Sequence, residues 1–249
     1  MGSPDERSDG RIPGNNAESG EPVMYQLNFA GLFPYWDDFL RGAVATLQMS
    51  VVATALGLVA GIFLAIGRRG RIGWVRLLSG AYIETIRNTP YLIQIFFLFF
   101  GLSSVGIRLP IFVAAIVTLV VNVAAYTAEI VRAGMDSIHP SQIEAAQALG
   151  LTTPQIYWDV ILRPSLERVY PSLTSQFVLM MLASSVTSQI SAEELTAAGN
   201  NIQSETFLSF ESFIVVAVLY IALAALMKLV FQGLALVLFP RRRRLGTSL

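Results

Sequence analysis

Apolar residues in this chain are gathered into five long blocks, at residues 39–66, 91–105, 109–131, 172–190 and 213–239. Most of these blocks are close to or longer than the about 20 residues that an α-helix needs to cross the hydrocarbon core of a bilayer. Charged residues make up only 14% of the 249 residues, whereas hydrophobic residues make up 54%. Soluble domains carry about a quarter charged residues, so this composition argues against an ordinary soluble enzyme. We therefore predict an all-α membrane protein with five transmembrane helices.

The placement of charge predicts how such a protein is oriented. Lysine and arginine together number 17, as do aspartate and glutamate, so no net charge would attract nucleic acid. Five spans put the termini on opposite sides, and the arginine-rich side faces the cytoplasm. Segments 68–76, 132–168 and 241–244 carry the clustered arginines and lie on one side of a five-span topology. We expect the amino terminus outside and the carboxyl terminus in the cytoplasm.

The two ends of the chain differ from the apolar blocks. Residues 1–23 are acidic, rich in Gly, Ser and Asn, and without periodic apolar residues, which predicts a disordered tail. They lack the basic start and apolar run of a signal peptide, and Met24 is a candidate alternative start. Residues 24–244 form the expected membrane domain, and residues 245–249 form a short tail.

A polar segment between the third and fourth blocks carries signals for two short helices. Ser141 and Glu144 have the spacing of a capping box, and Gly150 closes the predicted helix. Thr153 is a predicted N-cap for the second helix, with Pro154 at the first helical position. We expect these helices to form a compact helical hairpin, about residues 134–170, on the inner face of the membrane.

Polar residues inside the third block share one helical face. Asn122, Tyr126 and Glu129 are spaced i, i+4 and i+7. Polar side chains within a membrane usually face the interior of a helix bundle or an aqueous path. Asn122 and Tyr126 are therefore candidates for a substrate path. The structural alternative is that Asn122 only bonds a neighbouring helix and that Glu129 only pairs with Arg132.

The fourth block is unusually polar for a span. Ser184 and Ser188 are spaced i and i+4, with Ser185 and Gln189 beside them. Serine in a membrane helix can simply bond the carbonyl four residues earlier in its own helix. The density of polar side chains favours a second wall of the same path.

Some kinds of function are excluded by what the sequence lacks. It has no cysteine and only one histidine, His139, so it cannot form a disulfide, a cysteine nucleophile or a multi-histidine metal site. It contains no phosphate-loop motif, so the chain is not itself an ATPase. We expect no catalytic residues, no metal and no cofactor in this chain. An ion-driven secondary transporter or channel subunit remains the alternative to the function considered next.

Several motifs carry a resemblance to a known family. Glu144-Ala145-Ala146, followed by Gly150, resembles the EAA loop of ABC-importer permeases. The wider sequence is similar to the polar amino acid branch, the histidine, glutamate, glutamine and arginine type. That similarity lies in Thr46-Leu47-Gln48, in residues 86–90 and 125–130, and in Pro171-Ser172-Leu173. Two departures are Leu162-Arg163-Pro164, where the proline is displaced by one residue, and Leu182-Ala183-Ser184-Ser185, where many relatives have a lysine before Thr-Ser.

The resemblance runs over about residues 24–244 and implies a type I ABC-importer transmembrane domain in the bacterial inner membrane. The chain would be the permease subunit of an ATP-driven importer of polar amino acids, and its path would open by alternating access. Implied partners are a second permease subunit, the same or paralogous, two ATP-binding subunits that hold ATP and magnesium, a solute-binding receptor and membrane lipid. The residues implied in docking the ATPase are Pro140, Glu144, Ala145, Ala146, Leu149, Gly150, Ile156 and Tyr157.

Overall fold

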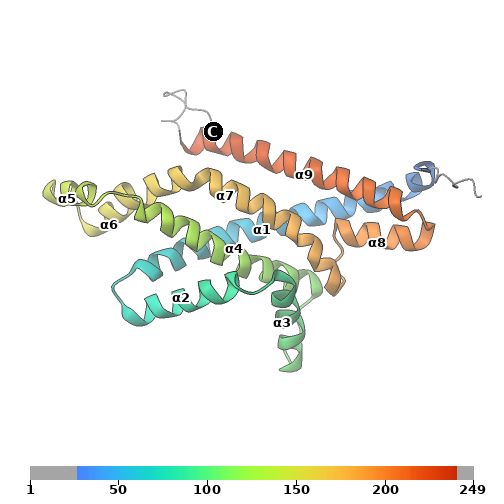
Figure 1. Ribbon diagram of the computed structural model, residues 1–249, viewed down its shortest axis with the longest axis horizontal. Helices are drawn as coiled ribbons and strands as arrows, with labels where there is room; N and C mark the ends of the chain where they lie inside the picture. Colours follow the sequence, from blue (N-terminus) through green and yellow to red (C-terminus); the bar gives the residue numbers. More distant parts are fainter. Residues whose placement is uncertain (1–26, 240–249) are drawn as a thin grey trace, which may run out of the picture.

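The computed structural model describes residues 27–239, and all regular structure in this range is helical (Figure 1). The predicted tails, residues 1–23 and 245–249, lie outside the described residues. The α-helices are α1 (Trp36–Arg69), α2 (Gly73–Arg87), α3 (Tyr91–Ser104), α4 (Ile111–Asp136), α5 (Pro140–Ala148), α6 (Thr153–Gln155), α7 (Arg163–Ala183), α8 (Leu195–Thr206) and α9 (Ser209–Leu238). Two 3-10 helices, η1 (Ala30–Tyr35) and η3 (Ser184–Ile190), and a π-helix, η2 (Ile156–Leu162), complete the described chain.

Four helical segments of the described chain are long and apolar enough to cross a membrane. They are Ala30–Arg69, Ile111–Asp136, Thr153–Ile190 and Ser209–Leu238. The fifth expected span, residues 91–105, corresponds to α3, which is apolar but has only 14 residues. A straight crossing needs about 20 residues, so α3 alone is too short. The structure thus confirms an all-helical membrane fold with four helices of spanning length.

The helices of the bundle run roughly side by side, and the two described ends of the chain lie at opposite ends of it (Figure 1). Helices α1, α4 and α9 run in one direction, whereas α7 runs in the other. Helix α2 lies along α1 and α4, while α3 turns across them after the break at Asn88–Pro90. Helix α2 packs on the bundle through its buried residues Ser79, Gly80 and Ile83.

The closest helix pair in the bundle is α1 and α4. Gly57 and Gly61 of α1 face Val123 and Thr127 of α4, and a Cβ atom at either glycine would lie 2.5–2.6 Å from those side chains. Small residues at helix contacts in membranes allow this close approach of backbones. The largest buried apolar cluster continues from this seam to α7 and to Ala146 and other residues of segment 134–170, which we call the inner loop after its predicted position. Packing in the membrane and packing of the loop are therefore continuous.

The α1–α4 contact gives the first prediction. Gly57→Ala should lower the free energy of unfolding by about 1–3 kcal/mol, because the added methyl group overpacks the contact with Val123. The measurement is the thermal unfolding midpoint of the detergent-purified protein. Gly101→Ala is the matched control, since nothing lies within 4 Å of a Cβ atom at Gly101 on α3. Equal midpoints for the two variants would contradict a tight α1–α4 seam.

Candidate functional site

The inner loop begins with α5, whose start differs by two residues from the prediction. The N-cap is His139, and its Nδ1 atom accepts a hydrogen bond from the backbone N–H of Ser141 at 3.3 Å. Ser141, the predicted N-cap, lies inside the first turn instead. Pro140 explains the shift, because proline lacks an N–H and its fixed φ favours the first helical position.

The second loop helix is the amino-terminal end of the long helical segment Thr153–Ile190 and not a separate helix. Its N-cap is Thr152, one residue before the predicted Thr153, and the backbone N–H of Thr152 donates to Gln155 Oε1 at 2.8 Å. The helix then continues through the π-helix η2 into α7. Pro164 lies in the first turn of α7. Because proline lacks an N–H and clashes with an α-helical turn before it, a wider π-helical turn fits this position.

The residues predicted to dock a partner divide into an exposed set and a buried set. Pro140, Glu144, Ala145, Leu149 and Gly150 are exposed, and Leu149 is 79% exposed although it is apolar. Glu144 makes no hydrogen bond or ion pair within the described part of the chain. The other three are more enclosed: Ala146 and Ile156 are buried in the main apolar cluster, and Tyr157 is half-buried.

An exposed tryptophan was missed in the sequence. Trp158 of η2 is 62% exposed, close in the chain to the buried Ile156 that anchors the loop. The available signal was a large aromatic side chain next to Asp159, between the buried Ile156 and Ile161. Together with Leu149, Trp158 gives the inner loop exposed apolar side chains that suit contact with another protein.

Arginines from two spanning helices hold the base of the inner loop. Arg69 of α1 donates to the Met135 carbonyl at 3.0 Å. Arg168 of α7 donates to the carbonyl and the hydroxyl of Ser137, at 2.9 and 2.5 Å. The residues that lead into α5 are therefore bonded to two other helices of the bundle.

A pocket of about 450 Å³ contains the predicted face of α4. Asn122 is 3% exposed, and its Nδ2 atom donates to Gln94 Oε1 at 2.9 Å. The Oδ1 atom of Asn122 and the hydroxyl of Tyr91 are buried without a hydrogen-bond partner among the described residues. A buried polar atom without a hydrogen-bond partner costs folding free energy, and a ligand or water that bonds it removes that cost. The pocket is lined by Arg87, Asn88, Thr89, Pro90, Tyr91, Asn122, Tyr126 and Met180.

The predicted second wall does not join this pocket. Residues 184–190 form the 3-10 helix η3, in which side chains three residues apart share a face. The predicted pairing of Ser184 with Ser188 at i+4 therefore does not hold. Ser184 is fully buried and donates to the Met181 carbonyl, and Ser188 donates to the Ser185 carbonyl at 2.7 Å. Gln189 alone of this predicted set is exposed.

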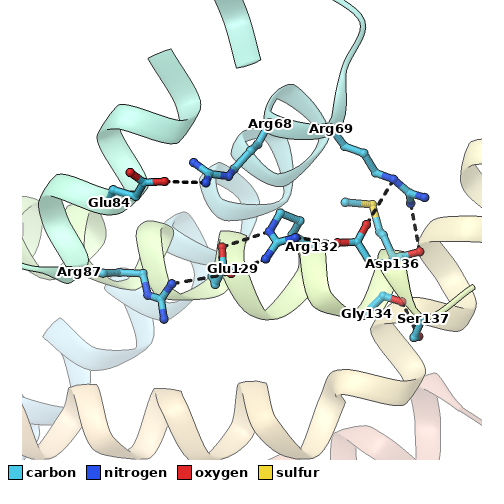
Figure 2. Close-up of polar contacts among 10 residues, drawn as sticks. Arg68, Arg69, Glu84, Arg87, Glu129, Arg132, Gly134, Asp136 and Ser137 are labelled. Carbon is cyan, nitrogen blue, oxygen red and sulfur yellow. Dashed lines mark hydrogen bonds and ion pairs between the residues drawn. The ribbon is translucent and has the colours of Figure 1, made fainter. Parts of the chain in front are cut away.

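The carboxyl-terminal end of α4 carries a row of ion pairs (Figure 2). Arg132 approaches Glu129 at 2.5 Å and Asp136 at 2.6 Å. The structural alternative for Glu129, a pair with Arg132 at i+3, is therefore confirmed. Arg87 of α2 lies 3.8 Å from the same Glu129 carboxylate, and its guanidinium also lies over the Tyr126 ring at 5.5 Å. These contacts connect the ion pairs to the pocket.

A buried carboxylate at the opposite end of the bundle was also missed. Glu194, the N-cap of α8, is fully buried. It accepts hydrogen bonds from the Tyr220 hydroxyl at 2.6 Å, the Ala197 N–H at 2.9 Å and the Thr46 hydroxyl at 3.3 Å. Burial raises the pKa of this carboxyl group, although its hydrogen bonds act in the opposite direction. Thr46 belongs to a motif noted in the sequence, but its pairing across 148 residues had no local signal.

Comparisons with known proteins agree with this architecture. Residues 57–244 match the family described as binding-protein-dependent transport system inner membrane component. The glutamine transport system permease protein of Escherichia coli strain K12 is 33% identical over 84% of this chain and 96% of its own length. The octopine transport system permease protein of Rhizobium radiobacter is 31% identical over 84% of this chain and 90% of its own length.

Solved structures show the same fold. An amino acid ABC transporter crystallised with histidines has a chain that is 31% identical, with a TM-score of 0.78 over 85% of this chain and 99% of that one. The MetNI methionine ABC transporter, in an inward-facing conformation, has a TM-score of 0.68 at 24% identity, over 83% of this chain and 98% of that one. At that identity the second likeness concerns the fold alone.

The buried Glu194 carboxylate gives a prediction for stability against pH. Because its pKa is raised, the folded state binds this proton more tightly than the unfolded state does. The free energy of unfolding should therefore fall as pH rises from the unfolded carboxyl pKa, about 4.3, through the raised pKa of the folded state. Glu194→Gln should remove this contribution and flatten the fall. The measurement is the unfolding midpoint of both proteins across that range. Glu205→Gln, at an exposed position on α8, is the control. An unchanged slope in Glu194→Gln would contradict the prediction.

Proposed function

Because the chain belongs to the family of binding-protein-dependent transport system inner membrane components, we propose that it is the permease subunit of an ATP-driven importer of polar amino acids. The observation that carries this proposal is the likeness to the solved amino acid ABC transporter, which extends over 99% of that chain at 31% identity. The glutamine and octopine permeases are similar over most of their length and support the same class of substrate. The substrate would be a polar amino acid or a close derivative.

The proposed topology has five crossings, with the amino terminus outside and the carboxyl terminus in the cytoplasm. Helices α1 and α4 run in the same direction, so the chain must return across the bundle between them (Figure 1). In this topology α2 and α3 make that return together, with 15 and 14 residues on either side of the break at Asn88–Pro90. The arginine-rich α1–α2 turn and the inner loop then lie on the cytoplasmic side, as the positive-inside rule requires.

In the proposed complex, α5 seats on a separate ATPase. The exposed Pro140, Glu144, Ala145 and Leu149 would form the contact, with Trp158 beside them. Small Ala145 permits close approach, and Glu144 is free to accept a charge-assisted hydrogen bond. The buried Ala146 and Ile156 would hold α5 on the membrane helices, so that movement of the ATPase is passed to them. Two ATP-binding subunits, with their ATP and magnesium, complete this side.

The pocket beside α4 is the proposed segment of the translocation path. It offers an acceptor in Asn122 Oδ1, a hydroxyl in Tyr91 and a positive charge in Arg87, which suits a zwitterionic, polar solute. A second permease subunit, identical or paralogous, would close the path opposite this wall. A receptor outside would deliver the amino acid. The Glu129 carboxylate is ion-paired with Arg132, which disfavours its use as the proton carrier that the alternative of proton-coupled transport would need.

The docking proposal predicts the effect of a change at Gly150. Gly150 has φ +74°, a conformation that costs other residues about 1–2 kcal/mol, and nothing lies within 4 Å of a Cβ atom there. Gly150→Val should therefore disturb only the corner after α5. We expect normal membrane abundance, with loss of ATPase co-purification and amino acid uptake.

The matched control is Gly106→Val in the α3–α4 loop. Gly106 has φ +89° and equally open surroundings, so the backbone strain is comparable. This variant should keep the ATPase bound during purification. If Gly150→Val also retains the ATPase and full uptake, α5 and its corner do not dock the partner.

The path proposal predicts a pattern of thiol labelling. The chain has no cysteine, so single substitutions can be probed without background. Tyr126→Cys should react with a small maleimide, and its rate should change when ATP is added to the complex, because alternating access changes the exposure of the pocket. Ser184→Cys should stay unreactive, since Ser184 is fully buried at the start of η3, whereas the exposed Gln189→Cys should react. If ATP does not change the labelling rate of Tyr126→Cys, the translocation path does not include this pocket.

A further inference from the structure

A chain of polar contacts joins the base of the inner loop to the pocket. It consists of Asp136, Arg132, Glu129 and Arg87, which we call the relay, and it ends at the Tyr126 ring. Asp136 is the last residue of α4, and it also pairs with Arg69 of α1 at 3.5 Å. The residue after it, Ser137, is held by Arg168 of α7. One end of the relay therefore lies where the inner loop meets the bundle, and the other end lines the pocket.

The contacts along the relay are unequal. Arg132 binds both oxygens of Glu129, at 3.2 and 2.5 Å, and reaches Asp136 at 2.6 Å through its remaining nitrogen. Arg87 approaches Glu129 from the other side, at 3.8 Å (Figure 2). A separation of that length is an ion pair without a hydrogen bond. Arg87 is therefore the loosely held member of the relay. Its position depends on how many oxygens of the Glu129 carboxylate are bonded to Arg132.

Arg87 lies where such a dependence matters. It is the last residue of α2, directly before the break at Asn88–Pro90, and it lines the pocket together with Tyr126. Its side chain is 39% exposed and is shared between the Glu129 carboxylate and the Tyr126 ring. A change in the Glu129 contact would therefore alter the place of a guanidinium that lines the pocket.

We infer that Glu129 is a positioning residue that links the inner loop to the pocket: through Arg132 and Asp136 it sets the place of Arg87 over Tyr126. This inference rests on the proposed function, because it requires α5 to move with the ATPase. A movement of α5 pulls on Ser137 and Asp136, and Arg132 then divides differently between Asp136 and Glu129. Arg87 gains or loses its carboxylate partner accordingly, at the opposite end of the relay.

A neighbouring ion pair provides a matched control. Arg68 of α1 bonds Glu84 of α2 at 2.7 Å, and neither residue contacts the relay in any hydrogen bond or ion pair of the described chain (Figure 2). Glu84→Gln makes the same chemical change as Glu129→Gln, in the same region of the molecule. It removes the carboxylate charge that pairs α1 with α2, and it removes none of the hydrogen bonds or ion pairs of the relay.

The test measures thiol labelling of Asn88→Cys, an exposed position that lines the pocket, in the complex purified with its ATPase. Labelling rates with a small maleimide are compared without nucleotide and with ATP plus vanadate, in the absence of receptor and substrate. In the Asn88→Cys background the two rates should differ on the order of fivefold, the low end of ordinary coupling between sites. Adding Glu129→Gln should bring the ratio close to one while the ATPase stays bound, and adding Glu84→Gln should leave the ratio unchanged.

The outcomes separate the inference from the function on which it rests. If Asn88→Cys alone shows no nucleotide dependence, or if no ATPase co-purifies, the proposed function fails. If the dependence is present and Glu129→Gln retains it, the relay is overturned and Glu129 only stabilises α4. Should Glu129→Gln fail to accumulate in the membrane, Arg87→Gln decides, because it leaves the Glu129–Arg132 pair in place. A preserved nucleotide dependence in Arg87→Gln would equally overturn the relay.

Discussion

The contact between α1 and α4 is the interaction on which the rest of the structure depends. Between helices in a bilayer, lipid tails offer no hydrophobic driving force, so close packing and interhelical hydrogen bonds must hold the bundle together. Gly57 and Gly61 provide the packing by admitting Val123 and Thr127 of α4. Helix α4 in turn carries the pocket residue Asn122, the relay residues Glu129, Arg132 and Asp136, and the connection to α5. The position of both candidate functional regions is thus set by one tight helix seam.

Some buried polar groups of the bundle have hydrogen-bond partners and others have none, and this difference separates structural groups from candidate binding groups. Glu194 is buried with three hydrogen-bond donors and ties α8 to α1 and α9. Ser184 and Ser188 of η3 each bond the carbonyl three residues earlier in the chain. Asn122 Oδ1 and the Tyr91 hydroxyl, in contrast, have no partner among the described residues and line the same pocket. A buried polar atom left unpaired destabilises the fold, which points to a role in binding.

The sequence predicted those features that local patterns control. The apolar blocks gave α1, α4 and α9 to within a few residues, and Gly150 was expected to close α5, where it has positive φ. Local rules also misplaced two N-caps, because Pro140 and the Thr152–Gln155 capping box shifted each start. The direction of α3, the 3-10 form of η3 and the pairing of Thr46 with Glu194 depend on contacts distant in the chain. No periodicity within a single segment could reveal them.

The central claim is that this chain conducts amino acids only as part of an ATP-driven complex. It is tested most directly by uptake into proteoliposomes that contain this chain with its ATPase and receptor, with labelled glutamine as the first solute. ATP-dependent uptake that disappears when either the ATPase or the receptor is omitted is the predicted result. Uptake by the chain alone, driven by a proton or sodium gradient without ATP, would contradict the claim and favour a secondary transporter.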